Sequence, residues 1–333
     1  MRKIFCGIAL GMFLFAFSEY AQGADSFYEP LPAVPFPADN AWSQDKQDLG
    51  KMLYFDPRLS GSNWISCATC HNPGLGWSDA LPRALGHGQK QLGRNSPSII
   101  NSGYFELQFW DGRAKSLEEQ ALGPIQAPGE MHRKLDDLIK ELNAIPGYVQ
   151  LFKKVFPESG ITLSNIAKAI ATFERSIVSK NSPYDKYQQG DQSAMSASAV
   201  EGMNLFFGKA KCAICHNGPA FTDSKFHNIG VKNHGILKSD PGRYNVTKDK
   251  SDKGAFKTPG LRHVSRTAPY MHDGSEATLK DVIEFYNRGG DVAKNRSPFI
   301  TPLGLTDAEK KSLVDFLKAL EGEPITVTLT ELP

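Results

Sequence analysis

Two short stretches with the same spacing decide the fold: Cys67-Ala68-Thr69-Cys70-His71 and Cys212-Ala213-Ile214-Cys215-His216. Each reads Cys-x-x-Cys-His, the pattern by which c-type haem is attached to a chain. The two thiols of one copy bond to the two vinyl groups of one porphyrin, and the adjacent histidine supplies a nitrogen to the iron. We therefore predict two covalent haems, attached through Cys67 and Cys70 and through Cys212 and Cys215, with His71 and His216 as iron ligands.

Two other uses of the four cysteines are a zinc site and a pair of disulfides. Zinc does not require a histidine directly after the second cysteine of each pair. Disulfides suit an oxidising compartment, but they leave the same two histidines unexplained. The haem interpretation accounts for the four cysteines and for both histidines, so we prefer it.

The first residues have the pattern of a secretory signal peptide. Met1-Arg2-Lys3 is a basic start, residues 4–17 are mostly apolar, and Ala21-Gln22-Gly23 gives small residues before a cut ahead of Ala24. The apolar run is short for a bilayer span, and no later run is long enough. We expect residues 1–23 to be removed together with Cys6, and the mature protein to be periplasmic without a membrane span. Haem c attachment generally takes place on that outer side of the cytoplasmic membrane.

Length and charge restrict the classes of function. The 333 residues are enough for two domains of ordinary size. The formal charge of +2 arises from interspersed basic and acidic residues, and no basic run indicates nucleic-acid binding. The apolar content of 40% is ordinary for a globular protein.

A weak internal repeat precedes the two haem motifs. Gly50-Lys51-Met52-Leu53-Tyr54-Phe55 and Gly202-Met203-Asn204-Leu205-Phe206-Phe207 share the pattern Gly-x-x-Leu-aromatic-Phe. Such self-similarity indicates a duplicated unit. We predict an N-terminal domain over residues 24–180 and a C-terminal domain over 181–333, each helical and each with one haem. Residues 24–45 would form an extended arm, and residues 181–196, rich in Ser, Gln, Asp and Gly, the linker.

Helical periodicity dominates the rest of the chain. Apolar residues have helical spacing within 130–143, after Thr162 and within 306–320, and strand signals are few and short. Thr278 and Thr306, each followed three residues later by an acid, fit the capping-box pattern at two further helix starts. The fold class is therefore mainly α.

Several specific stretches of the chain resemble a known family, the bacterial dihaem cytochrome c peroxidases and their relatives of the MauG type. The resemblance covers roughly residues 46–320 and is carried by Leu59-Ser60-Gly61, Gly93-Arg94-Asn95-Ser96-Pro97, Phe109-Trp110-Asp111-Gly112-Arg113-Ala114, Leu117-Glu118-Glu119-Gln120-Ala121, Phe226-His227-Asn228-Ile229-Gly230 and Ala268-Pro269-Tyr270-Met271-His272-Asp273-Gly274. It implies two cytochrome c-like domains that face each other across a calcium ion. The N-terminal haem would meet hydrogen peroxide, and the C-terminal haem would relay electrons.

The resemblance assigns roles near the N-terminal haem. Trp110 matches a tryptophan between the two haems, whose indole passes an electron by transient oxidation; the alternative is a core aromatic beside Phe109. Glu130 matches the distal acid that moves a proton during peroxide cleavage. Glu130 could also begin the helix predicted over 130–143, where a carboxylate favours the helix dipole. Gln120 and Pro124 match positions that shape the same pocket.

Two further assignments concern calcium and a movable histidine. Asn95, Thr267 and Pro269 match the calcium ligands of the family, the last two through their backbone carbonyls, and oxygen ligands suit this hard cation. His87, in Gly86-His87-Gly88, matches a histidine that caps the peroxidatic iron in the resting peroxidases and leaves on reduction of the other haem. His87 is either this gate or a loop histidine that never reaches the iron.

Tyr286 distinguishes the two branches of the family. The peroxidases place a methionine there as second ligand of the relay haem, whereas MauG relatives have a tyrosine. A phenolate favours the oxidised states of iron and lowers its potential, so a His/Tyr haem is suited to holding an oxidising equivalent. Two alternatives stay open: Met271 as the ligand, or Tyr286 as a core residue on the helical stripe with Leu279, Val282 and Ile283.

One departure limits the likeness to MauG. MauG has a tryptophan shortly before its second haem motif, through which its protein substrate is oxidised, and the matching position here is Ala210. We therefore expect a dihaem peroxidase that oxidises an organic or protein substrate. The resemblance does not imply that this substrate is the one of MauG. A peroxidase fed by a small cytochrome or cupredoxin is the second hypothesis, and a dihaem electron carrier the third. The sequence leaves the oligomeric state open.

Overall fold

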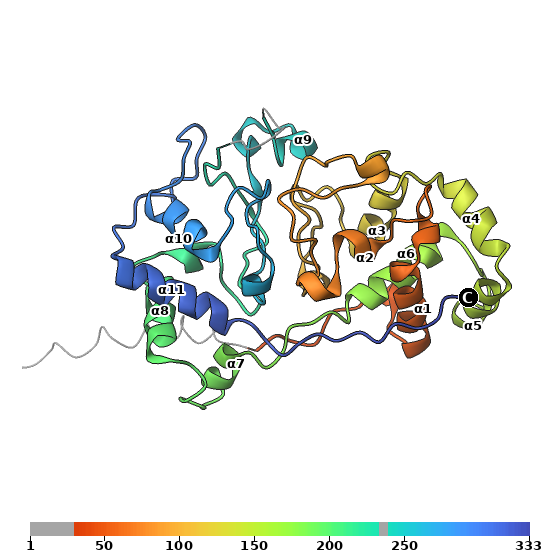
Figure 1. The fold of residues 1–333 in the computed structure, drawn as a ribbon, viewed down its shortest axis with the longest axis horizontal. Helices are drawn as coiled ribbons and strands as arrows, with labels where there is room; N and C mark the ends of the chain where they lie inside the picture. Colours follow the sequence, from red (N-terminus) through yellow and green to blue (C-terminus); the bar gives the residue numbers. More distant parts are fainter. Residues whose placement is uncertain (1–29, 233–238) are drawn as a thin grey trace, which may run out of the picture.

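The computed structural model describes residues 30–232 and 239–333. The expected signal peptide over residues 1–23 lies outside these described residues. The chain is mainly helical, as predicted, and forms two lobes side by side, with α1 to α6 in one and α7 to α11 in the other (Figure 1). Within residues 30–232 and 239–333, no helix has both the length and the apolar character needed to cross a membrane.

The helices of the two lobes follow the chain order. The first lobe contains α1 (Gln44–Phe55), α2 (Cys67–Cys70), α3 (Leu117–Gln126), α4 (Leu135–Asn143), α5 (Pro146–Val155) and α6 (Leu163–Glu174). The second lobe contains α7 (Pro183–Gln188), α8 (Ala197–Phe207), α9 (Tyr244–Thr247), α10 (Leu279–Asn287) and α11 (Asp307–Ala319).

Extended structure is minimal in the described chain. Strands β1 (Phe226–His227) and β2 (Phe256–Lys257) pair antiparallel, with Phe226 opposite Lys257 and His227 opposite Phe256. Short 3-10 helices punctuate the loops: η2 (Ala38–Asn40), η3 (Pro57–Leu59), η4 (Pro73–Leu75), η5 (His87–Gln89), η6 (Ser102–Tyr104), η7 (Cys212–Ile214), η8 (Lys250–Asp252) and η9 (Val264–Arg266).

Each lobe has its own cluster of buried apolar side chains. The buried members of the first cluster come from residues 49–177, and those of the second come from residues 184–320. Helix α1 packs on α6 in the first lobe, and α8 packs on α11 in the second. The predicted domain boundary at residues 180–181 falls in the interval between the two clusters.

The internal repeat marks the closest helix crossing of each lobe. A Cβ atom placed on Gly50 would lie 1.9 Å from the carbonyl oxygen of Ala169, and one on Gly202 would lie 1.9 Å from that of Ser312. Both distances are shorter than any van der Waals contact, so only glycine permits these crossings. The aromatic of each repeat then stacks edge-on against the partner helix, Tyr54 on Phe173 at 5.0 Å and Phe206 on Phe316 at 5.1 Å between ring centroids. The repeated sequence pattern therefore corresponds to the same helix packing in both lobes.

The predicted helix starts are confirmed at three threonines. Thr162 accepts a hydrogen bond from the backbone N–H of Asn165, and Thr278 and Thr306 form reciprocal capping boxes with Asp281 and Glu309. Each cap satisfies backbone donors that the first helical turn leaves without a partner.

Two predictions about local structure are wrong. The helix expected over 130–143 begins only at Leu135, because the chain makes a turn after α3 before it becomes helical. Residues 181–196 are not a plain linker, since α7 forms within them and Tyr184 is buried in the second cluster. Asp185 of this helix forms an ion pair with Arg262 at 2.9 Å. The polar composition of this segment, which includes the N-cap Ser182, masks a short helix that packs against the second cluster.

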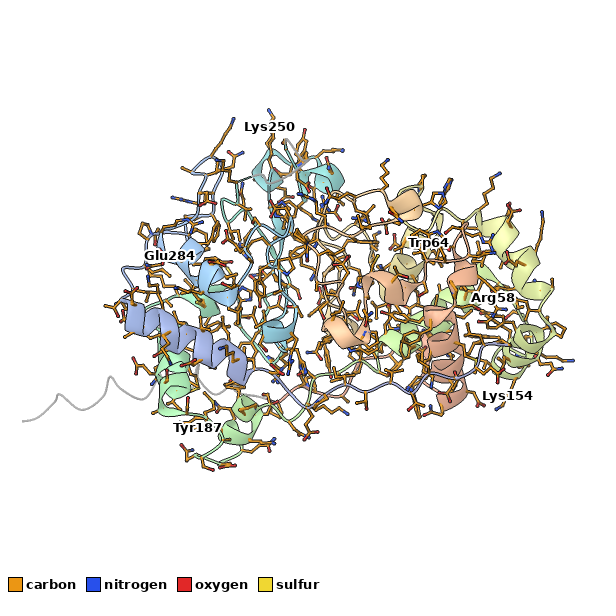
Figure 2. The ribbon with its side chains drawn as sticks, in the orientation of Figure 1. Arg58, Trp64, Lys154, Tyr187, Lys250 and Glu284 are labelled. Atoms are coloured by element: carbon orange, nitrogen blue, oxygen red, sulfur yellow. The ribbon has the colours of Figure 1, made fainter. Side chains whose placement is uncertain are left out.

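The chain returns to the first lobe after α11 (Figure 1). Ile325 and Val327 pack against the first cluster, although they follow the last helix of the second lobe. The Arg58 guanidinium, labelled in Figure 2, donates to the carbonyl oxygen of Pro333 at 2.9 Å. The two lobes are thus joined at residues 178–183 and again by this returning segment.

Candidate functional site

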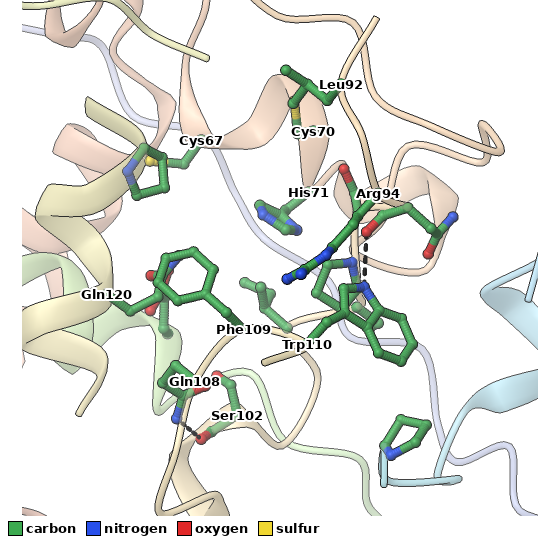
Figure 3. A pocket seen from close by; sticks show the side chains of 18 of the residues that line it. Cys67, Cys70, His71, Leu92, Arg94, Ser102, Gln108, Phe109, Trp110 and Gln120 are labelled. Atoms are coloured by element: carbon green, nitrogen blue, oxygen red, sulfur yellow. Dashed lines mark hydrogen bonds between the residues drawn. The ribbon is translucent and has the colours of Figure 1, made fainter. Parts of the chain in front are cut away.

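Each Cys-x-x-Cys-His motif lies on the wall of its own cavity. Cys67, Cys70 and His71 line a cavity of about 560 Å³ that is bounded mainly by the first lobe and also by residues 257–271 of the second, and part of it is shown in Figure 3. Cys212, Cys215 and His216 line a cavity of about 170 Å³ in the second lobe. These four cysteines of the described chain are free thiols. The two cysteine pairs line different cavities, an arrangement that does not suit one zinc site built from all four cysteines.

A helical turn sets the geometry of both motifs. The N–H of His71 donates to the carbonyl of Cys67 at 3.0 Å, and the N–H of His216 donates to that of Cys212 at 2.9 Å. One turn of this kind brings two thiols separated by two residues to one side and sets the following histidine at its end. The spacing of the motif thus becomes a three-point arrangement facing each cavity.

The two histidines are prepared to bind a metal through a neutral ring. Burial lowers the pKa of His71 to about 4, and it lowers the pKa of His216 as well. The Nδ1 atom of His216 lies 3.0 Å from the carbonyl oxygen of Phe221, which makes Nδ1 the protonated nitrogen and leaves Nε2 as the ligand atom. The Nδ1 atom of His71 is buried without a hydrogen bond of normal geometry. Free thiol pairs and neutral imidazoles fit the attachment of two haems.

Trp110 lines both cavities. Its indole Nε1 donates to the carbonyl oxygen of Asn95 at 2.9 Å, the contact drawn in Figure 3. Its own carbonyl accepts from the backbone N–H of Lys257 at 2.8 Å. The ring is therefore held at the junction of the cavities by bonds to both halves of the chain. Tyr270 and Val264 line both cavities as well, and the role of Trp110 in electron transfer stays a prediction.

Gln120, Pro124 and Glu130 all line the larger cavity. Helix α3 carries the first two, and Glu130 lies in the turn that follows, where its N–H donates to the carbonyl of Ala127 at 3.0 Å. Burial raises the pKa of Glu130, and Arg113 partly opposes this rise. The idea that Glu130 begins a helix is wrong, because the N-terminal cap of α4 is Lys134.

Tyr286 and Met271 both line the smaller cavity together with His216. Tyr286 extends from α10, and Met271 lies in a loop and itself has a positive φ of 71°. Burial raises the pKa of the Tyr286 phenol, so an anionic phenolate forms there only with a partner such as a metal ion. Both predicted ligands are thus positioned in the same cavity.

His87 lies close to the larger cavity but is not among the residues that line it, whereas Gly86 is. Its backbone N–H donates to the carbonyl of Glu130 at 2.8 Å, and its ring meets His132 edge-on at 4.5 Å. The neighbouring Gly88 has a φ of 65° and open space around it. In this arrangement the imidazole packs against a second histidine, and its role as a gate stays a prediction.

The three residues predicted to bind calcium line the same cavity. The larger cavity is lined by Asn95, Thr267 and Pro269, although about half of the chain separates the first residue from the other two. The Asn95 side chain is oriented by donation from Nδ2 to the carbonyl of Leu81 at 2.9 Å. An amide oxygen and two carbonyl oxygens are ligands of the kind that calcium prefers.

Sequence reasoning missed Arg94 as a residue that joins the two lobes. Its guanidinium pairs with Asp111 at 2.7 Å and with both carboxylate oxygens of Asp240 at 2.7 and 2.9 Å. Bidentate pairs of this kind are strong and directional. Arg94 also lines the larger cavity, where Figure 3 shows it extending toward His71. Nothing in the sequence links Arg94 to Asp240, because the pair is formed by the fold.

Two buried charged groups were also missed. Glu174, at the end of α6, lines the larger cavity with its Oε2 atom buried and without a hydrogen-bond partner. Burial raises the pKa of this carboxyl to about 8. Lys257 lines both cavities, and burial lowers the pKa of its amine to about 8. The residues that flank Glu174 and Lys257 in the sequence do not indicate that either side chain is buried.

A third group lies beside the smaller cavity. Ligand atoms of Cys215, Asp223 and His227 lie within 4.8 Å of one another. Asp223 bonds to Nε2 of His227 at 2.8 Å, which orients this ring on the cavity wall. Cys215 is also one of the cysteines predicted to attach a haem, and a sulfur used in that way would leave Asp223 and His227 as an oriented histidine at the cavity edge.

Comparisons with known proteins agree with this architecture. A sequence model of the family described as di-haem cytochrome c peroxidase matches residues 44–193. This family couples two c-type haems on one chain, and the protein belongs to it as an oxidoreductase.

Particular relatives come from both branches of that family. The methylamine utilization protein MauG of Methylorubrum extorquens is 44% identical over 302 residues, which cover 90% of this chain and 85% of that protein. The cytochrome c551 peroxidase of Nitrosomonas europaea is 40% identical, over 91% of this chain and 87% of its own. A solved MauG-like protein associated with microbial copper homeostasis superposes with a TM-score of 0.82 at 32% identity, over 88% of this chain and 94% of that one.

Proposed function

We propose that this dihaem enzyme uses hydrogen peroxide at the His71 cavity and shares the resulting oxidising equivalents with the His216 cavity through Trp110, in the periplasm, to oxidise an organic or protein substrate. The observation that carries the proposal is the position of Trp110 on the walls of both cavities. Redox chemistry at the two irons is supplied by the haems when they are bound. The residues of the chain supply positioning, proton transfer and electron transfer.

Glu130 handles the proton. Peroxide cleavage needs a base for the proton of the inner oxygen and an acid that returns it to the leaving oxygen, and one carboxylate can do both. Burial raises the pKa of Glu130 toward the range in which both steps are accessible. Gln120 and Pro124 limit the space around this carboxylate on the same wall.

Trp110 carries the electron. An indole loses an electron more readily when its N–H donates to an acceptor, because oxidation makes that proton more acidic. The carbonyl of Asn95 is such an acceptor at 2.9 Å. Asn95 is also the residue proposed to bind calcium with Thr267 and Pro269, so the ion would stiffen the support of the indole.

Tyr286 favours the MauG-like form of the reaction. With a phenolate ligand the second haem has a low potential and is suited to storing an oxidising equivalent. Met271 in the same place would give a high potential and favour the second candidate, in which a small cytochrome or cupredoxin feeds electrons for the reduction of peroxide to water. Ala210, where MauG has its exit tryptophan, is buried on the smaller cavity, so the substrate of MauG does not follow from the likeness.

One experiment separates these forms. The diferric protein is mixed with hydrogen peroxide under anaerobic conditions, and absorption spectra are recorded from milliseconds to minutes. A long-lived change in both haem bands without prior reduction supports the MauG-like form. A requirement for one-electron reduction beforehand supports the peroxidase form. No response of either band, before or after reduction, would overturn the proposal of peroxide chemistry.

A further inference from the structure

Lys257 is a buried charged residue at the junction of the cavities that the proposed reaction does not use. It ends β2, is buried, and lines both cavities, a property it shares with Trp110. Its backbone N–H binds the carbonyl of Trp110 at 2.8 Å. The backbone therefore fixes this lysine beside the indole, and the amine extends from there.

The described chain gives this amine no anionic partner. Its recorded side-chain contact is with the ring of Phe105, with Nζ 4.3 Å from the ring centroid. Burial alone lowers the pKa of the amine, and no nearby carboxylate raises it. An unpaired buried ammonium is costly, and such charges in folded proteins are normally paired.

Arg94, at the same junction, differs from Lys257 because carboxylates of the protein neutralise its charge. It faces two carboxylates, Asp111 from the first lobe and Asp240 from the second, so the protein itself satisfies its charge. Arg113 also binds Asp111, at 3.0 Å. The charges of these four residues cancel, whereas the amine of Lys257 has no carboxylate partner in the described chain.

A group that enters the cavities must supply the missing anion. The family binds two haems, and each c-type haem keeps two propionate carboxylates after its vinyl groups have reacted with cysteines. We propose that Lys257 binds haem propionates from both cavities and acts as their shared counter-ion beside Trp110. The inference depends on haem attachment, which the family establishes, and not on the proposed use of peroxide.

The consequence is electrostatic. A positive charge shared by the two haems stabilises the reduced state of each iron and raises both midpoint potentials. It also disfavours lasting oxidation of the indole next to it, so Trp110 would pass an electron without storing the positive charge. Lys257 is thus a positioning and charge-tuning residue.

The test uses the holoprotein with Lys257→Met, which keeps the length of the side chain and removes the charge. Midpoint potentials of both haems are measured by spectroelectrochemistry without peroxide, and propionate bending bands are measured by resonance Raman spectroscopy. We expect the reduction equilibrium constant of each haem to fall at least tenfold, which is 59 mV for a one-electron couple, and the propionate bands to shift. Lys257→Arg should leave both readouts near those of the native protein.

Lys253→Met is the matched control, because this exposed lysine lies four residues earlier and its loss removes the same formal charge. It should change neither readout. If Lys257→Met does not fold, Lys257→Gln replaces it and should lower both potentials. Unchanged potentials and unchanged propionate bands in the folded variant would overturn the proposal. A shift at one haem alone would overturn the claim that the counter-ion is shared.

Discussion

The two lobes share a scaffold and differ in the walls of their cavities. Each has a Gly-x-x-Leu-aromatic-Phe helix crossing and a Cys-x-x-Cys-His turn. The cavity of the first lobe is lined by the acids Asp111, Glu130 and Glu174, whereas the described lining of the second contains no carboxylate and includes Tyr286. The comparison teaches that two lobes with the same helix crossing and the same motif can carry different side chains around their cavities. One wall offers carboxylates for proton transfer, and the other offers the phenol of Tyr286 and no carboxylate.

The largest expected effect removes the proton-transfer group of the first lobe. Glu130→Gln keeps the shape and cannot accept a proton, so peroxide-dependent change of the haem spectrum should slow about 10²–10⁴-fold. Stopped-flow absorption measures the rate. Glu158→Gln, at an exposed position, is the control and should react normally. A normal rate in Glu130→Gln would remove this carboxylate from the reaction and weaken the contrast between the walls.

The next effect concerns the ligand in the second lobe. Tyr286→Met should raise the midpoint potential of one haem by on the order of 100 mV, because a thioether favours reduced iron and a phenolate favours oxidised iron. Spectroelectrochemistry resolves the two haems, and the other should change little. Met271→Leu is the companion variant, and it should leave the potential in place. The opposite pattern would identify Met271 as the ligand.

The shared scaffold is tested by a pair of small substitutions. Gly50→Ala and Gly202→Ala should each lower the free energy of unfolding by about 3 kcal/mol, because the new methyl group would overlap a backbone carbonyl. Unfolding in denaturant is followed by the absorption of each haem. Gly50→Ala should make the first lobe unfold at lower denaturant concentration, and Gly202→Ala should do the same for the second lobe. Gly74→Ala is the control, since its Cβ would meet a side-chain oxygen at 3.3 Å. Equal losses in both lobes would show that the lobes do not unfold separately.

The smallest effect is a pH dependence of stability specific to the first lobe. Burial raises the pKa of Glu174 from 4.5 to about 8, so the native state binds this proton more tightly than the unfolded chain does. The free energy of unfolding should therefore fall as pH rises from about 4.5 to about 8 and level off above. Glu174→Gln removes the ionisable carboxyl and with it this loss of stability, so the variant should be more stable than the native protein at pH 7 by about 1–2 kcal/mol.

Unfolding in denaturant at half-unit steps from pH 5 to pH 9 measures this dependence. Glu158→Gln is again the control, because an exposed carboxyl should leave the curve unchanged. If Glu174→Gln and the native protein have parallel curves, the carboxyl is satisfied in the holoprotein by a partner that keeps its ordinary pKa.

The sequence predicts what local chemistry determines. The haem motifs, the threonine caps at 162, 278 and 306 and the apolar face of α11 depend on residues within one or two turns of each other, and all appear where expected. The repeated glycines could be recognised in the sequence. The reason for them, close approach to the backbone of Ala169 and of Ser312, is apparent only in the folded structure.

Features made by distant pairs could not be read in advance. The bond of Arg94 to Asp240 and the inward position of Lys257 depend on how the lobes meet. The start of α4 at Leu135 was misplaced because apolar spacing continues through a turn that bonds to the end of α3. Residues 181–196 were misjudged because their polar composition conceals the buried Tyr184.

The segment that returns to the first lobe has a consequence for the order of events in biosynthesis. Ile325 and Val327 complete the apolar surface around residues of the first cluster, yet they are translated after the whole second lobe. In the order of the chain, the first lobe therefore gains these two packed side chains only after both Cys-x-x-Cys-His motifs have been made.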